Sequence, residues 1–175
     1  MSAPVPSPSL SDPGDRDPAP FKVEAATTDD FLAIAALDRI AWRHAPHGDR
    51  IADGEHIWRI WCEEALTFVA RAPNDLLAGA VVAFPCLSGL YCLHKAMVDF
   101  AFRGQGLGSL LFEGLLGELD RRGITCFLTV APGNDAAIRL YRKWGFCQEE
   151  LVHGYYRPDE DRLVLTRPPA PARAM

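Results

Sequence analysis

The chain has 175 residues, of which 49% are apolar and 23% are charged, a composition typical of a globular domain and not of a disordered or fibrous protein. The 18 Lys and Arg against 23 Asp and Glu give a net charge of −5, which disfavours a general nucleic-acid binder, because such proteins carry a basic excess. No run approaches the roughly 18 apolar residues of a membrane span, and the first residues lack the pattern of a signal peptide. We therefore expect a cytoplasmic protein with no nucleic-acid or membrane partner.

Proline divides the chain into one domain and two tails. Of the 14 prolines, only five lie within residues 21–167. Proline lacks a backbone donor and fixes φ, so segments rich in it do not hold a helix or a strand ladder. We expect disordered tails at 1–20 and 168–175 and a single domain at 21–167.

The five cysteines form no CxxC pair, which favours reduced thiols over a disulfide framework or a zinc site. We expect no metal in this protein.

The first half of the domain shows a strand, two helices and a hairpin. Residues 21–26 alternate as in a strand, and apolar residues at helical spacing predict helices at 31–43 and 54–64. The strand-like runs 66–71 and 77–84 flank a Pro-Asn-Asp turn and predict a hairpin.

The second half alternates strands with helices. The segments expected there are a strand at 90–98, a helix from about 106 to 122, a strand at 125–130, a helix at 135–144, and strands at 147–152 and 163–166. The order β-α-α-β-β-β-α-β-α-β-β predicts a single α/β (α+β) domain with a mixed sheet and helices packed against it.

A glycine-rich turn, Arg103-Gly104-Gln105-Gly106-Leu107-Gly108, joins a strand to a helix. Alternate glycines leave the backbone N–H groups unobstructed, and the helix N-terminus adds the positive end of its dipole, so the turn favours a phosphate or pyrophosphate ligand. The alternative is a flexible turn whose glycines serve only tight packing. No Lys follows as in a P-loop, and Ser109 stands where a dinucleotide fingerprint needs Gly or Ala, so both nucleotide patterns fail.

Two segments resemble the GNAT superfamily of acyl-CoA-dependent N-acetyltransferases. Residues 98–108 are similar to its coenzyme A loop, with Arg103, Gly106 and Gly108 in the pattern positions. Residues 134–146 are similar to its N-x-x-A-x-x-x-Y-x-x-x-G-F helix and exit turn. The order of the elements also agrees, so the resemblance covers residues 21–166.

The resemblance implies a mostly antiparallel sheet with splayed parallel central strands and helices on both faces. It implies acetyl-CoA as co-substrate, with its pyrophosphate on the loop amides and its pantetheine arm between strands 90–98 and 125–130. A primary amine would attack the thioester directly in a ternary complex, without an enzyme nucleophile. The coenzyme-binding residues that it implies are Met97, Val98, Arg103, Gly104, Gln105, Gly106, Leu107, Gly108, Ser109, Asn134, Ala137 and Tyr141.

Tyr141 and His94 are the catalytic candidates. Tyr141 stands at the family's tyrosine position and would protonate the departing thiolate, since a phenol stays neutral at pH 7; alternatively it is a core residue of an amphipathic helix. His94 suits deprotonation of the substrate ammonium and lies four residues before Val98, which places both on one face of a regular strand. The alternatives are that His94 is a structural histidine, and that Glu63, Glu64 or a water chain serves as the base. Asn134 is expected to cap its helix, contact the coenzyme, or both.

The acceptor amine remains open between a small molecule and a peptide or protein. The segment 154–158, with Tyr155 and Tyr156, looks like the tyrosine-bearing hairpin of protein N-terminal amine acetyltransferases; the alternative is ordinary aromatic packing. Lys95 departs from the family's apolar strand and points either to solvent or toward the acceptor. We expect a monomer or homodimer, and the alternative function is a catalytically inactive GNAT-like module that binds or senses acyl-CoA.

Overall fold

The computed structural model of the protein describes residues 21–43 and 52–171. The expected tail 1–20 and the last four residues of the expected tail 168–175 lie outside the described residues, so their disorder stays a prediction. None of the helices in the two described ranges combines the length and apolar composition that crossing a membrane requires.

The elements agree with the predicted order, and their ends shift by no more than one residue. In chain order they are β1 Lys22–Ala25, α1 Phe31–Arg43, α2 Glu55–Glu64, β2 Leu66–Arg71, β3 Leu77–Pro85, β4 Tyr91–Val98, α3 Leu107–Arg122, β5 Cys126–Val130, α4 Asp135–Lys143, β6 Gln148–Val152 and β7 Arg162–Arg167. A short 3₁₀ turn, Phe100–Phe102, was not predicted; Asp99 caps it by accepting the Ala101 N–H at 2.8 Å.

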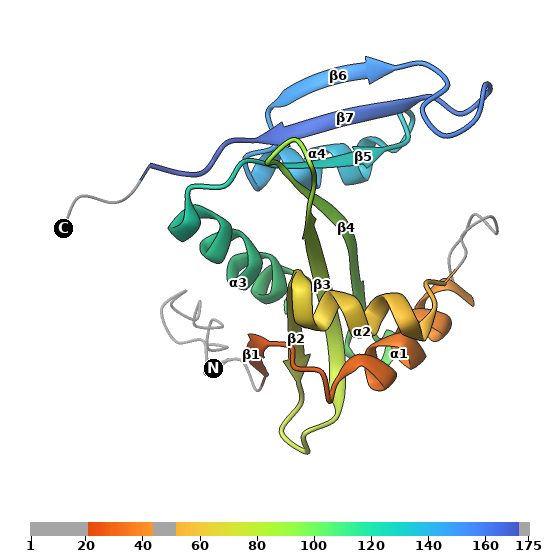
Figure 1. Ribbon diagram of the computed structural model, residues 1–175. Helices are drawn as coiled ribbons and strands as arrows, with labels where there is room; N and C mark the ends of the chain where they lie inside the picture. Colours follow the sequence, from red (N-terminus) through yellow and green to blue (C-terminus); the bar gives the residue numbers. More distant parts are fainter. Residues whose placement is uncertain (1–20, 44–51, 172–175) are drawn as a thin grey trace, which may run out of the picture.

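The seven strands form one sheet in the order β1-β2-β3-β4-β5-β7-β6, in which the β4–β5 pair alone is parallel. Helices α1 and α2 lie on one side of strands β2 to β4, and α3 lies on the other side (Figure 1). The expected mixed sheet with helices on both faces is therefore confirmed.

Each face of the sheet has its own core. On the α3 side, Leu107, Leu111, Leu115 and Leu119 recur at every fourth position and are almost completely buried. Burial of one such side chain contributes about 1.5–3 kcal/mol, so this stripe accounts for both the helix and its docking. The α1 and α2 side is packed around Trp58, with buried residues such as Ile34 and Val82.

The parallel strands β4 and β5 are paired over a short stretch only. Tyr91 lies opposite Cys126 and Cys92 opposite Phe127, and the pairing ends there. Beyond it, Leu93 and residues 95–98 of β4 stay paired with β3, while residues 128–130 of β5 stay paired with β7. The two strands therefore separate, as the family resemblance implied. We call the paired stretch the closed end and the separated stretch the open end.

A β-bulge in β4 changes which way its side chains point. Val82 of β3 lies opposite Lys95 and the next residue, Ala83, lies opposite Leu93, so His94 is the extra residue. Leu93 belongs to the core on the α3 side, whereas His94 contacts Trp61 and Phe84 on the opposite side.

The bulge corrects one prediction. His94 and Val98 were expected on one face of a regular strand, but Val98 packs against the α3-side core while His94 faces α2. Strict alternation fails here because the extra residue resets the two-residue period of the strand.

Candidate active site

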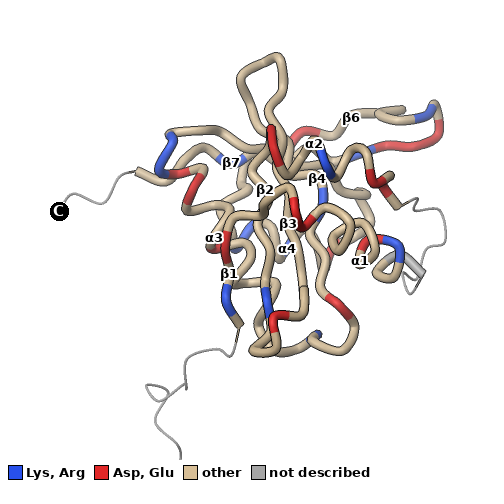
Figure 2. Tube along the Cα trace, turned by 60° about the horizontal axis from the view of Figure 1, so that its bottom comes forward, with Lys and Arg blue, Asp and Glu red and all other residues tan. Residues whose placement is uncertain are grey.

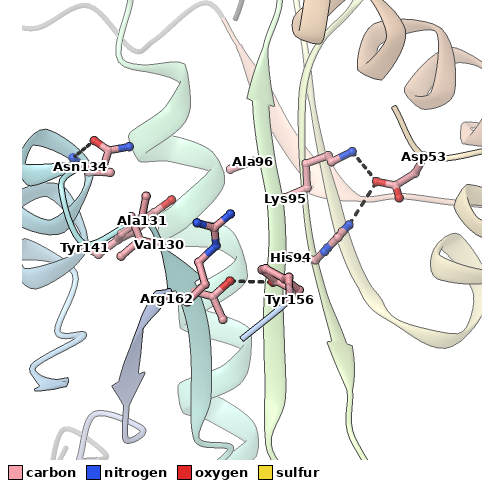
Figure 3. A pocket seen from close by; sticks show the side chains of 12 residues that line it. Asp53, His94, Lys95, Ala96, Val130, Ala131, Asn134, Tyr141, Tyr156 and Arg162 are labelled. Carbon is pink, nitrogen blue, oxygen red and sulfur yellow. Dashed lines mark hydrogen bonds and ion pairs between the residues drawn. The ribbon is translucent and has the colours of Figure 1, made fainter. Parts of the chain in front are cut away.

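A cavity of about 430 Å³ lies at the open end, in the size range of small-molecule sites. Figure 3 shows residues of β5 and α4 on one side of it and residues of β4, together with Asp53, on the other. Its lining residues are Asp53, His94, Lys95, Ala96, Thr129, Val130, Ala131, Asn134, Ala137, Tyr141, Tyr156 and Arg162.

Helix α4 brings Tyr141 to the cavity. The Asn134 side chain caps the helix by accepting the Ala137 N–H at 3.2 Å, so the predicted cap is confirmed. At the other end Gly145 adopts φ +89°, and the following N–H, of Phe146, donates to the Tyr141 carbonyl at 3.2 Å. The half-buried Tyr141 ring packs near Phe112 and Phe146, which fixes the position of the phenol on the cavity wall.

The glycine-rich turn has the geometry of an anion site. Gly104 and Gly106 adopt φ +78° and +81°, and a Cβ added at either would meet no atom within 4 Å. Gly106 is the N-cap of α3, and the N–H groups of Ser109 and Leu110 donate to its carbonyl. The N–H groups of Leu107 and Gly108 come before them at the start of the helix. No helical carbonyl lies one turn earlier to accept from these two groups, so they can bind an anion.

Arg103 is held at the base of this turn. Its Nε donates to the Val98 carbonyl at 3.3 Å, and its guanidinium lies 5.4 Å from the centroid of the Phe100 ring. Along the described trace, Lys and Arg are interspersed with Asp and Glu (Figure 2). An anionic ligand at this turn would therefore depend on local amides and Arg103, and not on a broad basic surface.

Some of the predicted site residues line the cavity, and others do not. His94, Asn134, Ala137 and Tyr141 line it. The turn residues 103–109 lie outside its lining, and the Met97 side chain is buried in the core on the α1 and α2 side. The predicted coenzyme contacts of Met97, Val98 and the turn therefore stay predictions.

A cluster of charged groups forms the wall of the cavity beside α1 and α2. Lys95 is only 7% exposed, and its Nζ donates to both oxygens of the fully buried Asp38, at 2.9 and 3.0 Å, and also to Asp53. Asp38 further accepts the indole N–H of Trp58 at 3.0 Å. Lys95 therefore does not point to solvent: its ammonium group is buried between two carboxylates on the cavity wall.

His94 joins this cluster through Asp53. The Nε2 of His94 lies 3.1 Å from Oδ2 of Asp53, the same oxygen that binds Lys95 (Figure 3). Burial by itself raises the pKa of Asp53, but the hydrogen bonds from His94 and Lys95 outweigh it and hold that pKa below its usual range.

Residues from β5, from the segment before β7 and from the start of β7 complete the cavity. The hydroxyls of Thr129 and Tyr156 lie 2.8 Å apart, and the Arg162 guanidinium lies 5.2 Å from the Tyr156 ring centroid. Arg162 also forms an ion pair with Glu160.

Asp53, Thr129 and Arg162 also line the cavity, although no sequence pattern pointed to them. The alternative bases Glu63 and Glu64 are exposed on α2 and lie outside the cavity lining.

Three cysteines outside the cavity lining carry thiols that are protonated at neutral pH. Burial raises the pKa of Cys62 to about 11 and those of Cys92 and Cys126 to about 12. A thiol with so high a pKa is a poor nucleophile, which agrees with direct transfer to a substrate amine. Within residues 21–43 and 52–171, no group of three or more His, Cys, Asp or Glu side chains is arranged to hold a metal ion.

Residues 33–146, about two thirds of the chain, match the model of the Acetyltransferase (GNAT) family. The chain belongs to this family. The resemblance drawn from the glycine-rich turn and the α4 segment is thereby confirmed.

Relatives of this GNAT protein act on different amines. It is 38% identical over 80 residues to the [Ribosomal protein bS18]-alanine N-acetyltransferase of Salmonella typhimurium, covering 43% of this chain and 54% of that protein. It is 30% identical over 117 residues to the L-2,4-diaminobutyric acid acetyltransferase of Streptomyces avermitilis, covering 54% and 65%. The chain thus spans about half the length of the first relative and less than two thirds of the second.

Among solved structures, the ribosomal-protein-S18-alanine N-acetyltransferase from Escherichia coli is similar along almost its whole length. The TM-score is 0.70 at 27% sequence identity, over 89% of this chain and 99% of that one. The GNAT fold of this protein is therefore supported both by sequence and by three-dimensional similarity.

Proposed function

We propose that this protein transfers the acetyl group of acetyl-CoA to a primary amine, by direct attack in a ternary complex. The observation that carries the proposal is the separation of β4 from β5, which opens a cavity with Tyr141 on one wall and His94 on the other. Family membership supports the same reaction, and two relatives carry the names of amine acetyltransferases.

The residues of the open end fit acetyl-CoA. A pyrophosphate has space at Gly104 and Gly106, where side-chain atoms are missing, and Arg103 lies beside them. Residues 93–98 of β4 have no strand partner on the β5 side, so their backbone is available to an extended pantetheine arm, as to an added strand. We propose that Met97 and Val98 act through their backbone, and that residues 103–109, Asn134, Ala137 and Tyr141 complete the coenzyme site.

His94 and Tyr141 would carry out the proton transfers of the reaction. His94 takes a proton from the substrate ammonium, which gives the nitrogen a lone pair for attack on the thioester carbonyl. A C–N bond forms and, as the tetrahedral intermediate collapses, the C–S bond breaks. The Tyr141 hydroxyl donates its proton to the departing sulfur, and the nitrogen gives up its second proton, which restores the Tyr141 hydroxyl. The products are therefore an acetamide and neutral CoA thiol, with the first proton left on His94.

The acceptor is proposed at the level of its chemistry, as a small-molecule or peptide amine. It would reach the cavity between the β4 wall and the Tyr156 side, where the Thr129 and Tyr156 hydroxyls offer hydrogen bonds. We further propose that the protein works in the cytoplasm, where acetyl-CoA and amine metabolites are available.

A thiol-release assay tests this function. Purified full-length protein is incubated with acetyl-CoA and a panel of amino acids, polyamines, aminoglycosides, arylalkylamines and N-terminal peptides. We expect CoA release with at least one class. Tight binding of acetyl-CoA with no release from any amine would contradict the proposal and favour a non-catalytic acyl-CoA-binding module.

With an active acceptor in hand, Tyr141→Phe should lower kcat by about 100-fold, because one general acid is lost, with little change in the Kd of acetyl-CoA. Tyr91→Phe is the matched control, since Tyr91 lies at the closed end and outside the cavity lining. Equal activity of the two variants would remove Tyr141 as the acid.

A further inference from the structure

The β-bulge places two consecutive side chains of β4 on the same carboxylate. His94 and Lys95 would point to opposite faces in a regular strand, yet both contact Oδ2 of Asp53. Asp53 precedes α2 and lies 41 residues from His94 in the sequence, so only the fold brings the pair together.

We propose that Asp53 is a positioning residue for His94, and that the buried Lys95–Asp38 pair holds the Asp53 carboxylate in place for this role. The inference rests on the proposed function, in which His94 is the base. It adds a residue that acts through His94 and does not touch the substrate.

The contacts restrain both partners of this pair. The Asp53 N–H donates to Oδ2 of Asp38 at 2.8 Å, and Lys95 bridges the two carboxylates. The His94 ring lies 4.9 Å from Trp61 and 5.7 Å from Phe84, between ring centroids. With two aromatic neighbours and one hydrogen bond, the imidazole has little freedom to rotate.

The hydrogen bond also sets the tautomer of His94. A neutral imidazole that donates from Nε2 to a carboxylate has its lone pair on Nδ1. Asp53 would therefore orient the ring so that Nδ1 is the atom that accepts the proton of the ammonium.

The charges around His94 predict in which direction its protonation should change when Asp53 is replaced. Asp53 contacts it directly, with Lys95 and Asp38 behind, and these three groups together carry one negative charge. The elements packed on its ring, α2 and β3, contribute the uncharged Trp61 and Phe84. Across the cavity Arg162 is paired with Glu160. Asp53→Asn removes the negative charge in direct contact with His94 and leaves Lys95 as the nearest strong charge, so the variant should disfavour a protonated imidazole.

The test is an NMR titration of the histidine rings in the full-length protein, with His94→Gln to assign the signal. Asp53→Asn should lower the titration midpoint of His94 by about 0.5 to 1 pH unit, because an adjacent carboxylate is neutralised. The matched control is Asp161→Asn, which removes the carboxylate 2.8 Å from His153 and should move that histidine alone. An unchanged His94 midpoint in Asp53→Asn would overturn the inference.

The kinetic readout separates positioning from mere structure. In Asp53→Asn the acid limb of the kcat/KM profile should move to lower pH by the same amount as the NMR midpoint, while the plateau falls about 10-fold through lost orientation. A limb that stays in place while the NMR midpoint moves would overturn the role of Asp53 in the reaction.

The two proposals fail in distinguishable ways. The titration uses neither acetyl-CoA nor acceptor, so a missing shift overturns the Asp53 inference alone. Full activity in His94→Gln would overturn the proposed base, and the positioning role with it, while leaving acetyl transfer itself intact.

Discussion

The closed and open ends of the β4–β5 pair share two structural features, but these features serve different purposes at the two ends. Each has a left-handed glycine capping α3: Gly123 with φ +68° at the closed end and Gly106 with φ +81° at the open end. Each also has a cation that is at least nine-tenths buried and held by carboxylate: Arg167 at the closed end and Lys95 at the open end.

At the closed end the glycine cap and the buried cation only hold helices and strands together. Arg167 lies opposite Cys126 in the sheet, binds both oxygens of Asp120 on α3 at 2.7 and 2.8 Å, and donates to the Trp144 carbonyl after α4. At the open end the corresponding cluster faces a cavity and includes a titratable histidine. The difference between them is whether the two parallel strands are paired, so the loss of backbone pairing turns a structural motif into a candidate site.

The largest effect is expected from breaking the closed-end ion pair. Arg167→Met leaves Asp120 and the Trp144 carbonyl without their cation and should lower the free energy of unfolding by about 3 kcal/mol. Chemical denaturation measures this loss. The Kd of acetyl-CoA should not change. The control is Arg121→Met. Arg121 lies on the exposed side of α3, the helix that carries Asp120, so this change should leave the free energy of unfolding unaltered. If Arg167→Met changed the Kd of acetyl-CoA more than the free energy of unfolding, the closed end would not be purely structural.

The two glycine caps offer a matched pair of substitutions. Gly106→Val should weaken acetyl-CoA binding by about 100-fold, because a branched side chain blocks approach to the loop amides. Gly123→Val introduces the same left-handed strain at the other end of α3 and should cost stability without changing the calorimetric Kd. Equal Kd values for Gly106→Val and the unmodified protein would exclude the turn as the pyrophosphate site.

A smaller effect is expected at the hydrogen bond between Thr129 and Tyr156 in the cavity lining. Tyr156→Phe removes the hydroxyl 2.8 Å from Thr129 and should lower kcat/KM for the acceptor by about 3- to 10-fold, the cost of one hydrogen bond. Thr129→Val should have a similar effect, and the double variant should be no worse than either. Additive losses would show that the two hydroxyls do not act as a pair.

The smallest effect concerns acid stability at the closed end. The hydrogen bonds from Arg167 hold the pKa of Asp120 below its usual range. A carboxyl whose pKa is lower in the folded state stabilises the protein above its unfolded pKa of about 4, and this contribution is lost as the pH falls through the folded value. Denaturation curves between pH 7 and pH 3 should therefore show a steeper acid loss in the unmodified protein than in Asp120→Asn. If both proteins lost the same amount of stability as the pH falls, the Asp120–Arg167 pair would not contribute to the acid loss.

Local patterns predicted the elements because each carries its own signal. The leucines of α3 recur at helical spacing, and Gly123 and Gly145 mark the ends of helices. Asn134 and Tyr141 could be placed by their motif, since one helix cap and about two helix turns after it fix both.

The charged wall of the cavity could not be predicted in the same way. The bulge at His94 depends on pairing with β3, and Asp53 reaches its partners from a segment before α2. One signal was present: Asp38 and Lys95 are opposite charges within mainly apolar stretches, and buried charges are paired.

Hydrogen exchange measured with and without acetyl-CoA tests the central claim, that the open end is the coenzyme site. With acetyl-CoA at ten times its Kd, exchange in residues 93–98 and 104–109 should slow by about 10-fold, while the paired residues of the closed end stay unchanged. Protection confined to the closed end, or none at the open end under saturating coenzyme, would contradict the account.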